Sequence, residues 1–372
     1  MSLNAGDVMS SRKICFFNST KAWGGGEKWH FDIAARLHGT HGNVIVVAGK
    51  GSELGKRLVT TEIPHHNLAI GNLSFLNPFT IIKLVRLFKN ERPDVLIMNL
   101  PADLKAAGIA ARLAGVKRII YRRGSAIPVR DSFLNRVLFK YIIDDIIANS
   151  EETARTILDE NPGLFPCEKI HVIYNGVDWA TFDSLTQEPR DRHRQERVIL
   201  GNAGRLAPQK GQAVLVEVAR QLKDKGYSFE IVIAGEGKLK ETLMGKAVDA
   251  GVADQIRFLG FVDNMPQFLN SIDIFLLTSH WEGFGYVIAE AMYCQKPVVA
   301  YNVSSNPEIV SDNETGFLVD HGDVESFVIK TELLINDVEL RQKMGQKARE
   351  KAIERFSIQR TLKALEQLLY EQ

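Results

Sequence analysis

The fold of this chain is decided by the stretch Ile272–Met292, which reads IDIFLLTSHWEGFGYVIAEAM. The apolar run Ile272–Leu277 predicts a strand that is buried on both faces, as in a parallel sheet. A turn that contains Gly283 and Gly285 follows, and a helical pattern then continues to about Cys294. Glycines at such a turn let backbone N–H groups approach an anionic or hydroxyl-rich ligand. The stretch therefore predicts a strand–turn–helix unit with a ligand at the carboxyl end of the strand.

Two carboxylates accompany this turn. Glu282 lies in the turn itself, and Glu290 lies further along, inside the predicted helix. Because Glu282 precedes the helix, both side chains can face the same end of the sheet, as a general acid/base pair would. The alternative is an acidic first helical turn that complements the helix dipole.

Strand and helix patterns alternate along the rest of the chain. The predicted strands are Lys13–Asn18, Val44–Ala48, Asp94–Met98, Arg118–Tyr121, Ile146–Asn149, Val198–Arg205, Phe229–Ala234, Ile256–Gly260, Pro297–Ala300 and Gly316–Val319. This order predicts an α/β protein of two doubly wound, Rossmann-like domains that face across a deep inter-domain cleft. The polar, non-periodic stretch Thr186–Arg197 places the linker at residues 179–196. We therefore expect domains at residues 1–178 and 197–356, with a last helical segment at 357–372.

The charge of the chain is small overall but uneven. The net charge of +1 argues against nucleic acid as the main partner. Lys and Arg outnumber Asp and Glu by 23 to 17 in residues 1–178, and are outnumbered by 28 to 23 in the remainder. Residues 81–140 hold 13 basic and 4 acidic side chains. Such an excess is compatible with anionic lipid or a phosphorylated acceptor, although a solvated surface is the commoner reason for it.

The cysteines and the hydropathy pattern bear on the compartment. Cys15, Cys167 and Cys294 show no zinc-binding spacing, which favours a reducing compartment. We recognise no signal peptide and no apolar run of about 18 residues. We therefore expect a cytoplasmic protein, with peripheral association at the inner membrane surface left open.

Two further turns can contact a phosphate. Gly24–Gly26 follows the first strand and opens a helix, but its spacing matches neither GxGxxG nor a P-loop. The alternative at this place is a flexible turn. In the second half, Arg205 and Lys210 lie on either side of a turn before a helix that begins at Gly211. Both cations can converge there on one diphosphate, together with the helix N-terminus, unless they are only solvated loop cations.

Together these motifs resemble the retaining glycosyltransferases of the GT-B fold, of the family 4 (group 1) type. The resemblance covers most of the chain and is most specific in its second half. The motifs that carry it are Gly24–Gly26, Tyr174–Asp178, Arg205–Lys210, Ala234–Gly237, Leu259–Val262, the pair Glu282 and Glu290, and Asn313–Leu318.

The resemblance implies that the second domain binds a nucleotide-diphosphate sugar, of the UDP or GDP type. Arg205 and Lys210 would neutralise the diphosphate as the glycosidic bond breaks, a role that a metal ion plays in other enzymes. No DxD-type acidic pair is placed to hold a metal, so we expect a metal-independent reaction without a cofactor. The implied donor-binding residues are Gly25, Gly26, Gly235, Phe261, Val262, Gly283, Phe284, Gly285 and Glu290.

Particular roles also follow from the resemblance. Glu282, with the backbone at the glycine turn, would hold hydroxyls of the donor sugar, and Glu290 would accept hydrogen bonds from the ribose. Backbone near Phe261 and Val262 would contact the base. The turn at Gly25 and Gly26 would approach the diphosphate or the acceptor from the first domain. Residues 357–372 would cross back to that domain.

The chain departs from the family pattern where many relatives carry a histidine in the first domain. Those places hold Asn99 to Asp103 and an anion-friendly turn at Arg122–Ser125. We expect Asp103 to be the polar group of the first domain near the sugar. His30 and His280 are more simply structural. Retention needs no protein base, because the departing phosphate can take the proton of the acceptor.

The sequence therefore predicts transfer of a sugar to a hydroxyl acceptor, with retention at the anomeric carbon. The acceptor would be a glycan or lipid-linked hydroxyl, such as an envelope polysaccharide or lipopolysaccharide precursor. Three alternatives stay open: a nucleotide-sugar epimerase of the same fold, a nucleotide-dependent oxidoreductase, and a non-catalytic nucleotide-sugar sensor. The epimerase would need acids that flank the sugar, and the oxidoreductase would need the missing GxGxxG fingerprint.

Overall fold

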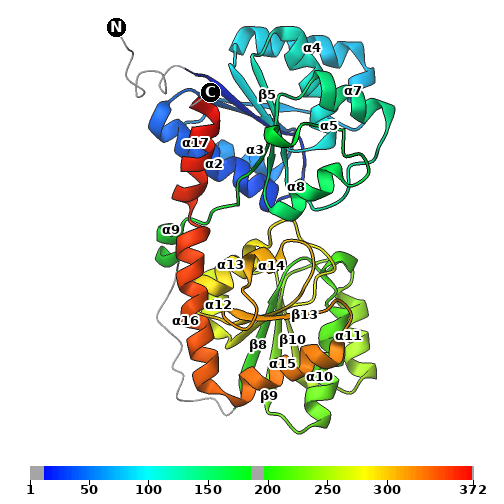
Figure 1. The fold of residues 1–372 in the computed structure, drawn as a ribbon, viewed down its shortest axis with the longest axis vertical. Coiled ribbons are helices and arrows are strands. Elements are labelled where there is room, and N and C mark those ends of the chain that lie inside the picture. Colours follow the sequence, from blue (N-terminus) through cyan, green and yellow to red (C-terminus); the bar gives the residue numbers. More distant parts are fainter. Residues whose placement is uncertain (1–11, 186–196, 371–372) are drawn as a thin grey trace. The chain divides into compact units, whose positions relative to one another are not determined.

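The structure is a computed structural model of the chain, and it describes residues 12–185 and 197–370. The chain divides into two compact units (Figure 1). Unit 1 consists of Met1–Tyr174 with Leu362–Gln372, and unit 2 consists of Asn175–Thr361. Each is a layered α/β body with one parallel sheet, so the predicted pair of doubly wound sheets is confirmed.

Unit 1 is built on a seven-stranded sheet of order β3-β2-β1-β4-β5-β6-β7. Its strands are β1 (Ile14–Asn18), β2 (Val44–Gly49), β3 (His65–Leu68), β4 (Val95–Met98), β5 (Arg118–Arg123), β6 (Asp145–Ala148) and β7 (Ile170–Val172). Every pairing between them is parallel. Since β1 lies between β2 and β4, the strand order reverses at β1, where ligands of doubly wound folds bind.

Helices cover both faces of this sheet. They are α2 (Gly25–His41), α3 (Glu53–Leu58), α4 (Pro78–Glu91), α5 (Pro101–Asp103), α6 (Ile109–Ala114), α7 (Phe133–Tyr141) and α8 (Glu151–Leu158), with short turns η1 (Ser74–Leu76) and η3 (Cys167–Lys169) and a π-helical turn η2 (Leu104–Gly108). Alternate strand residues such as Cys15 and Phe17 pack with α4, α6 and α7 in one core. Ser150 caps α8, since its side chain accepts a 3.0 Å bond from the amide of Thr153.

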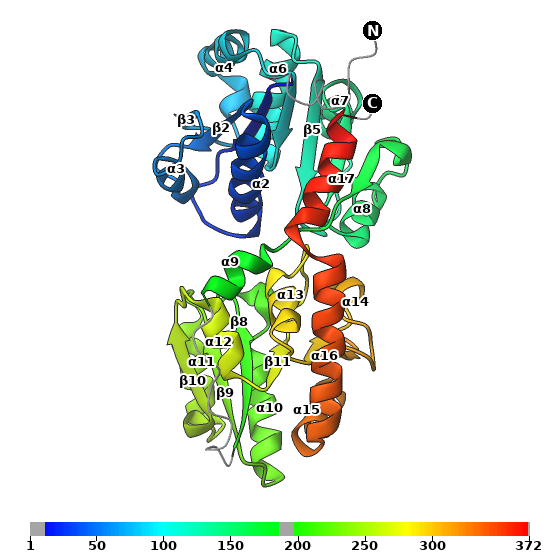
Figure 2. The same cartoon turned by 90° about the vertical axis from the view of Figure 1, so that its left-hand side faces the viewer.

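Unit 2 has a six-stranded sheet of order β10-β9-β8-β11-β12-β13. Its strands are β8 (Val198–Ala203), β9 (Phe229–Ala234), β10 (Ile256–Gly260), β11 (Ile274–Leu277), β12 (Val298–Tyr301) and β13 (Gly316–Val319). The helices are α9 (Trp179–Ser184), α10 (Ala213–Asp224), α11 (Lys240–Asp249), α12 (Met265–Ser271), α13 (Tyr286–Tyr293), α14 (Asn306–Ile309), α15 (Val324–Asn336) and α16 (Val338–Arg355), with short turns η5 (Pro208–Lys210) and η6 (Ala253–Gln255). The order again reverses at the first strand, because β8 lies between β9 and β11 (Figure 2).

The stretch expected as the linker, residues 179–196, begins with a helix. α9 packs within unit 2, where the ring of Trp179 stacks on Tyr293 at 4.1 Å and the hydroxyl of Tyr293 donates to Asp183 at 2.7 Å. Residues 186–196 of the expected linker lie outside the described residues.

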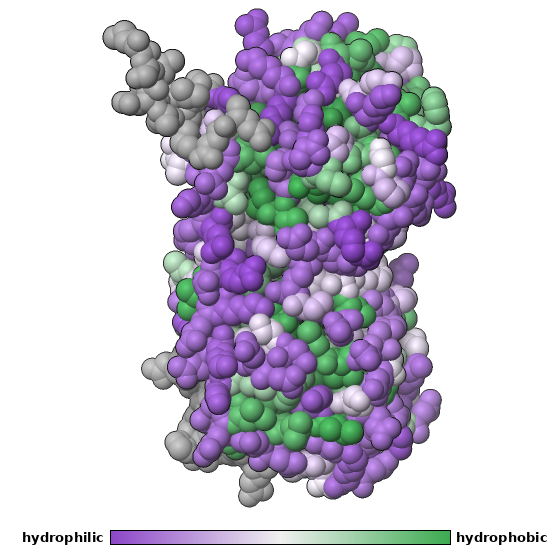
Figure 3. All heavy atoms as spheres, viewed as in Figure 1, coloured by the Kyte–Doolittle hydropathy of each residue, from purple (hydrophilic) through white to green (hydrophobic). Residues whose placement is uncertain are grey.

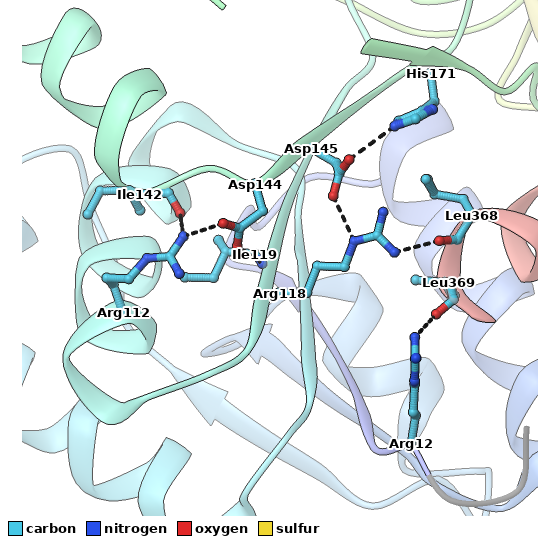
Figure 4. Close-up of polar contacts among 10 residues, drawn as sticks. All are labelled: Arg12, Arg112, Arg118, Ile119, Ile142, Asp144, Asp145, His171, Leu368 and Leu369. Atoms are coloured by element: carbon cyan, nitrogen blue, oxygen red, sulfur yellow. Dashed lines mark hydrogen bonds and ion pairs between the residues drawn. The ribbon is translucent and has the colours of Figure 1, made fainter. Parts of the chain in front are cut away.

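The last helix, α17 (Ile358–Tyr370), leaves unit 2 and ends in unit 1. Cations of unit 1 bind its final carbonyl oxygens: Arg118 donates to Leu368 at 2.5 Å, and Arg12 donates to Leu369 (Figure 4). Arg118 also binds Asp145 at 2.7 Å, and His171 reaches the other oxygen of that carboxylate at 3.1 Å. Burial raises the pKa of Asp145, but the bonds from His171 and Arg118 outweigh it and lower the pKa to about 2. The end of α17 is thus capped by positive charge, which the helix dipole favours.

Among the described residues, no helix is long and apolar enough to span a bilayer.

Candidate active site

The carboxyl ends of β8, β9 and β10 are held together through backbone contacts at glycines. The amide of Gly235 donates to the carbonyl of Gly260 at 2.7 Å, and the amide of Gly204 donates to the carbonyl of Ala234 at 2.9 Å. Gly235 has φ +140°, and a Cβ atom there would lie 1.9 Å from the carbonyl oxygen of Gly204. Only glycine can therefore occupy position 235, and the edge of the sheet presents backbone rather than side chains.

The turn after β8 packs on the loop after β11. The carbonyl of Gln209 accepts from the amide of His280 at 2.8 Å, and its side chain donates to the carbonyl of Trp281 at 3.0 Å. Gly211 has φ +61°, and a Cβ there would meet the carbonyl oxygen of Thr278 at 2.1 Å. The N-terminal end of α10 is thereby fixed beside the loop that opens α13.

An ion pair joins these two segments. The Nζ atom of Lys210 lies 2.5 Å from Oε1 of Glu282, and only 15% and 7% of the two side chains are exposed. The sequence predicts both residues as site residues, and the structure brings their side chains into contact although 72 positions separate them. A buried pair of this kind holds the ammonium group in one place. Removing the two charges from water costs free energy, and their mutual attraction offsets that cost.

The other predicted residues of unit 2 share this edge with different degrees of exposure. Arg205 is exposed and forms no ion pair with another residue of ranges 12–185 and 197–370. Phe261, just after β10, is 67% exposed, and Val262 is half-buried. Gly283 and Phe284 are buried, Gly285 has φ +71° at the start of α13, and Glu290 is half-buried within that helix. The carboxyl ends of these strands thus carry an exposed cation, Arg205, and an exposed aromatic ring, Phe261, in addition to the pair Lys210–Glu282.

A histidine pair that the sequence does not indicate lies beside this loop. Nδ1 of His280 and Nε2 of His321 are 2.7 Å apart, and both residues are exposed. His321 follows β13, so the loops after β11 and β13 touch through imidazoles. No spacing in the sequence predicts this contact, although His280 and His321 lie three and two positions after the ends of predicted strands.

In unit 1, polar side chains gather where β1 ends. Both oxygens of the Asp103 carboxylate accept from Ser19, one from the hydroxyl at 2.5 Å and one from the amide at 3.2 Å. Next to them, the side-chain amide of Asn18 donates to the carboxylate of Glu27 at 3.1 Å. Asp103 is completely buried, and burial raises its pKa to about 7 although the bonds from Ser19 act in the opposite direction. In this structure Asp103 holds the β1–α2 loop and does not face solvent.

The glycine turn of unit 1 opens a long helix without a side-chain cap. α2 has 17 residues, and Gly24 at its N-cap position offers no side-chain hydrogen bond. Gly25 is exposed, while a Cβ at Gly26 would lie 2.5 Å from the side-chain nitrogen of Asn99. The first N–H groups of this helix are therefore covered by no side-chain cap, as an anion site at a helix N-terminus requires.

Behind this turn lies a buried cation. Arg122 is 1% exposed, donates to Oδ1 of Asn99 at 2.7 Å and lies 4.4 Å from the ring centre of Trp29. The guanidinium groups of Arg122 and Arg123, at the turn expected to favour anions, are both buried, and the anion preference of that turn stays a prediction. Burial, with the charge of Arg122, lowers the pKa of His30 to about 3, which keeps this imidazole neutral.

No group of three or more His, Cys, Asp or Glu side chains suited to a metal ion occurs in the described part of the chain.

Comparison with known proteins assigns the family. A model described as "Glycosyl transferases group 1" matches residues 184–351, and one described as "Glycosyltransferase Family 4" matches residues 23–180. EpsD of Bacillus subtilis (strain 168), which is assigned to the glycosyltransferases, is 32% identical over 289 residues, 73% of this chain and 75% of EpsD. The chain is a glycosyltransferase of this family. The resemblance to the group 1 and family 4 glycosyltransferases is thus confirmed, and retention at the anomeric carbon stays a prediction.

Two further proteins extend the comparison of this glycosyltransferase over nearly its whole length. CapM of Staphylococcus aureus, a capsular polysaccharide biosynthesis glycosyltransferase, is 26% identical over 342 residues, 88% of this chain and 89% of CapM. Crystalline HepE of Anabaena, in complex with UDP and glucose, has a TM-score of 0.82 at 24% identity and covers 96% of this chain and 99% of its own. The glycosyltransferase therefore has the GT-B fold, as predicted.

Proposed function

We propose that this glycosyltransferase moves a sugar from a nucleotide-diphosphate donor to a hydroxyl acceptor, with retention at the anomeric carbon and without a metal ion. The observation that carries the proposal is the buried ion pair between Lys210 and Glu282, which lies in the same pair of loops as the exposed Arg205. A fixed ammonium group and a free guanidinium group suit a diphosphate, on which negative charge grows as its bond to the sugar breaks. HepE, of the same fold, was crystallised with UDP and glucose, which favours a donor of this class.

The proposed roles follow the edge of the unit 2 sheet. Arg205 and Lys210 neutralise the diphosphate, and Glu282 keeps Lys210 in position while it accepts hydrogen bonds from the donor sugar. Glu290 accepts from the ribose hydroxyls, and the backbone near Phe261 contacts the base. The backbone of Gly235, Gly283, Phe284 and Gly285, together with Val262, completes the donor site.

The transfer itself exchanges one bond to the anomeric carbon for another. The bond between that carbon and the diphosphate oxygen breaks with its electron pair, and the acceptor oxygen forms the new bond on the same face. The departing phosphate takes the proton of the acceptor hydroxyl. Gly25 and Gly26, at the uncapped start of α2, are proposed to receive the diphosphate or acceptor on the side of unit 1, and Asp103 acts through Ser19 by holding the preceding loop.

We propose an envelope glycan or its lipid-linked precursor as the acceptor. Support comes from CapM, which is named for the biosynthesis of a capsular polysaccharide. Sugar transfer to such a precursor would take place at the cytoplasmic face of a membrane.

Incubation with a panel of nucleotide sugars tests the proposal. We expect one donor to release its nucleoside diphosphate slowly by hydrolysis and faster with acceptor, with EDTA leaving the rate unchanged. Lys210→Ala should weaken donor binding, whereas Lys343→Ala, an exposed cation on α16, should not. If a donor binds but is never consumed with any acceptor, the protein is a sensor; loss of turnover with EDTA would refute the metal-free reaction.

A further inference from the structure

One face of unit 1 exposes large apolar side chains on neighbouring elements. Six side chains around η1, α4, α6 and α7 are 60% to 83% exposed: Leu73, Leu76, Phe79, Leu113, Phe133 and Tyr141. The opposite sides of α4 and α7 pack in the hydrophobic core, where Leu84, Phe88, Leu138 and Phe139 are buried. These helices are therefore apolar on the side that packs on the sheet, and apolar in part on the side that faces solvent.

These elements form one continuous surface. Lys105 of η2 lies 5.6 Å from the ring centre of Phe75 in η1, and Arg112 of α6 donates to the carbonyl of Ile142 at the end of α7 at 2.7 Å. In Figure 2, α6 lies between α4 and α7. The space-filling view shows apolar and polar surface side by side over α4 (Figure 3). We call this surface, formed by η1, α4, α6 and α7, the cationic–apolar face.

The charged residues on the elements of this face are mostly basic. The four elements contain six basic residues, Lys83, Arg86, Lys89, Arg112, Arg136 and Lys140, and one acidic residue, Glu91. Glu91 is engaged by residues outside these four elements, since Lys13 and His66 each lie 2.8 Å from its carboxylate. No acid of these helices therefore offsets their exposed cations.

Two of the six cations are neutralised by acids from adjoining loops, and four are not. Arg112 pairs with Asp144 at 2.7 Å, and Arg136 pairs with Asp131 at 2.5 Å. Lys83, Arg86, Lys89 and Lys140 are exposed and form no ion pair with any residue for which the structure gives a position. A protein surface that binds an anionic bilayer typically combines unpaired cations with Phe and Leu side chains that project into solvent, and this face has both.

We propose that the cationic–apolar face binds the surface of an anionic lipid bilayer. The four unpaired cations contact lipid phosphates, while Phe79 and Phe133 enter the boundary between headgroups and acyl chains. This binding goes beyond the sugar-transfer reaction and needs no turnover. If the acceptor is lipid-linked, as proposed above, the same face keeps unit 1 at the surface where that acceptor lies.

Vesicle co-sedimentation of the full chain tests this proposal. We expect binding to vesicles of phosphatidylcholine mixed with phosphatidylglycerol, little binding to phosphatidylcholine alone, and weaker binding as salt rises. Each cation near an anionic surface strengthens binding about fivefold, so Lys83→Gln with Arg86→Gln should weaken it about 25-fold. Phe79→Ser with Phe133→Ser should weaken it at least about tenfold, because both rings lose their burial in the bilayer.

Matched variants in unit 2 give the control. Lys343→Gln with Lys347→Gln removes two exposed cations of α16, and Val248→Ser removes a side chain of α11 that is 65% exposed. Neither variant should change vesicle binding. Donor consumption in the absence of vesicles should be the same in all variants, so that loss of lipid binding is distinguished from loss of the proposed reaction.

Four results would overturn the proposal. The first is that the protein does not sediment with anionic vesicles, and the second is that the unit 2 control variants lose vesicle binding to the same extent. The third is self-association of the protein through this face that vesicles do not reverse. The fourth is that the protein binds an oligonucleotide as tightly as it binds vesicles and that Phe79→Ser does not change this binding. The third would make the face an interface between copies of the chain. The fourth would make it a nucleic-acid surface.

Discussion

Removing the charge of Lys210 and removing the charge of Glu282 should lower the free energy of unfolding of unit 2 by different amounts. Lys210→Met leaves the carboxylate of Glu282, which is only 7% exposed, without its partner, and should destabilise unit 2 by about 3 kcal/mol. Glu282→Gln leaves an ammonium group that is 15% exposed and sits on a flexible stem, so it should cost less, about 2 kcal/mol. The double variant removes both charges together and should cost about 3 kcal/mol rather than the sum, which corresponds to a coupling energy of about 2 kcal/mol.

The cycle can be measured by urea unfolding of the four proteins. Hydrogen exchange of peptides from β11 gives a readout that is restricted to unit 2, which is needed because a chain of two units does not unfold in one step. A coupling energy below about 0.5 kcal/mol is what independent sites give, and it would refute the contact. The same result would remove the observation on which the proposed fixed cation at the diphosphate rests.

Three other predictions concern particular contacts. Gly235→Ala should abolish stable folding of unit 2, because the added Cβ would lie 1.9 Å from a carbonyl oxygen. A Cβ at Gly245 in α11 has no atom within 4 Å, so Gly245→Ala should stabilise unit 2 by up to about 1 kcal/mol. Thermal unfolding of both variants tests this difference. Burial raises the pKa of Asp103 to about 7, so the folded protein holds a proton that the unfolded chain loses at lower pH. The stability of the wild type relative to Asp103→Asn should therefore fall as the pH rises from about 4 to about 7, by at most about 1.4 kcal/mol per pH unit, and then stay level. Urea unfolding midpoints measured across that pH range test the sign. Arg118→Met should increase hydrogen exchange in the last turn of α17, and unchanged exchange would contradict the capping role.

The alternation of elements could be predicted because buried parallel strands are nearly continuous apolar runs. The run Ile272–Leu277 contains β11, and the helix expected between Gly285 and Cys294 is α13, Tyr286–Tyr293. β3 escaped prediction because His65–Leu68 is an edge strand whose residues are only partly buried and carry two histidines. Its pairing with β2, rather than its own composition, makes it a strand.

Side-chain partners could not be predicted, because strand ends indicate which edge of a sheet a residue occupies but not which atoms meet. Lys210 and Glu282 were each expected near a ligand, yet their contact depends on how Gly211 lets one turn pack on another. For Asp103 the sequence predicts a place near the sugar, and it gives no sign that this residue precedes a π-helical turn and lies completely buried against Ser19. A π-helical turn has no sequence signal, although such turns often accompany functional sites.

The polar groups at the two sheet edges are already engaged as structural partners. Glu282 holds Lys210, Asp103 holds Ser19, and Glu27 accepts from Asn18, while burial keeps His30 neutral. A carboxylate that is hydrogen-bonded in this way stabilises the position of a cation or loop, and it would have to give up that contact to take a proton from an acceptor. Fixed charge and fixed backbone are therefore what these edges offer a substrate, which is why our proposal leaves the acceptor proton to the departing diphosphate.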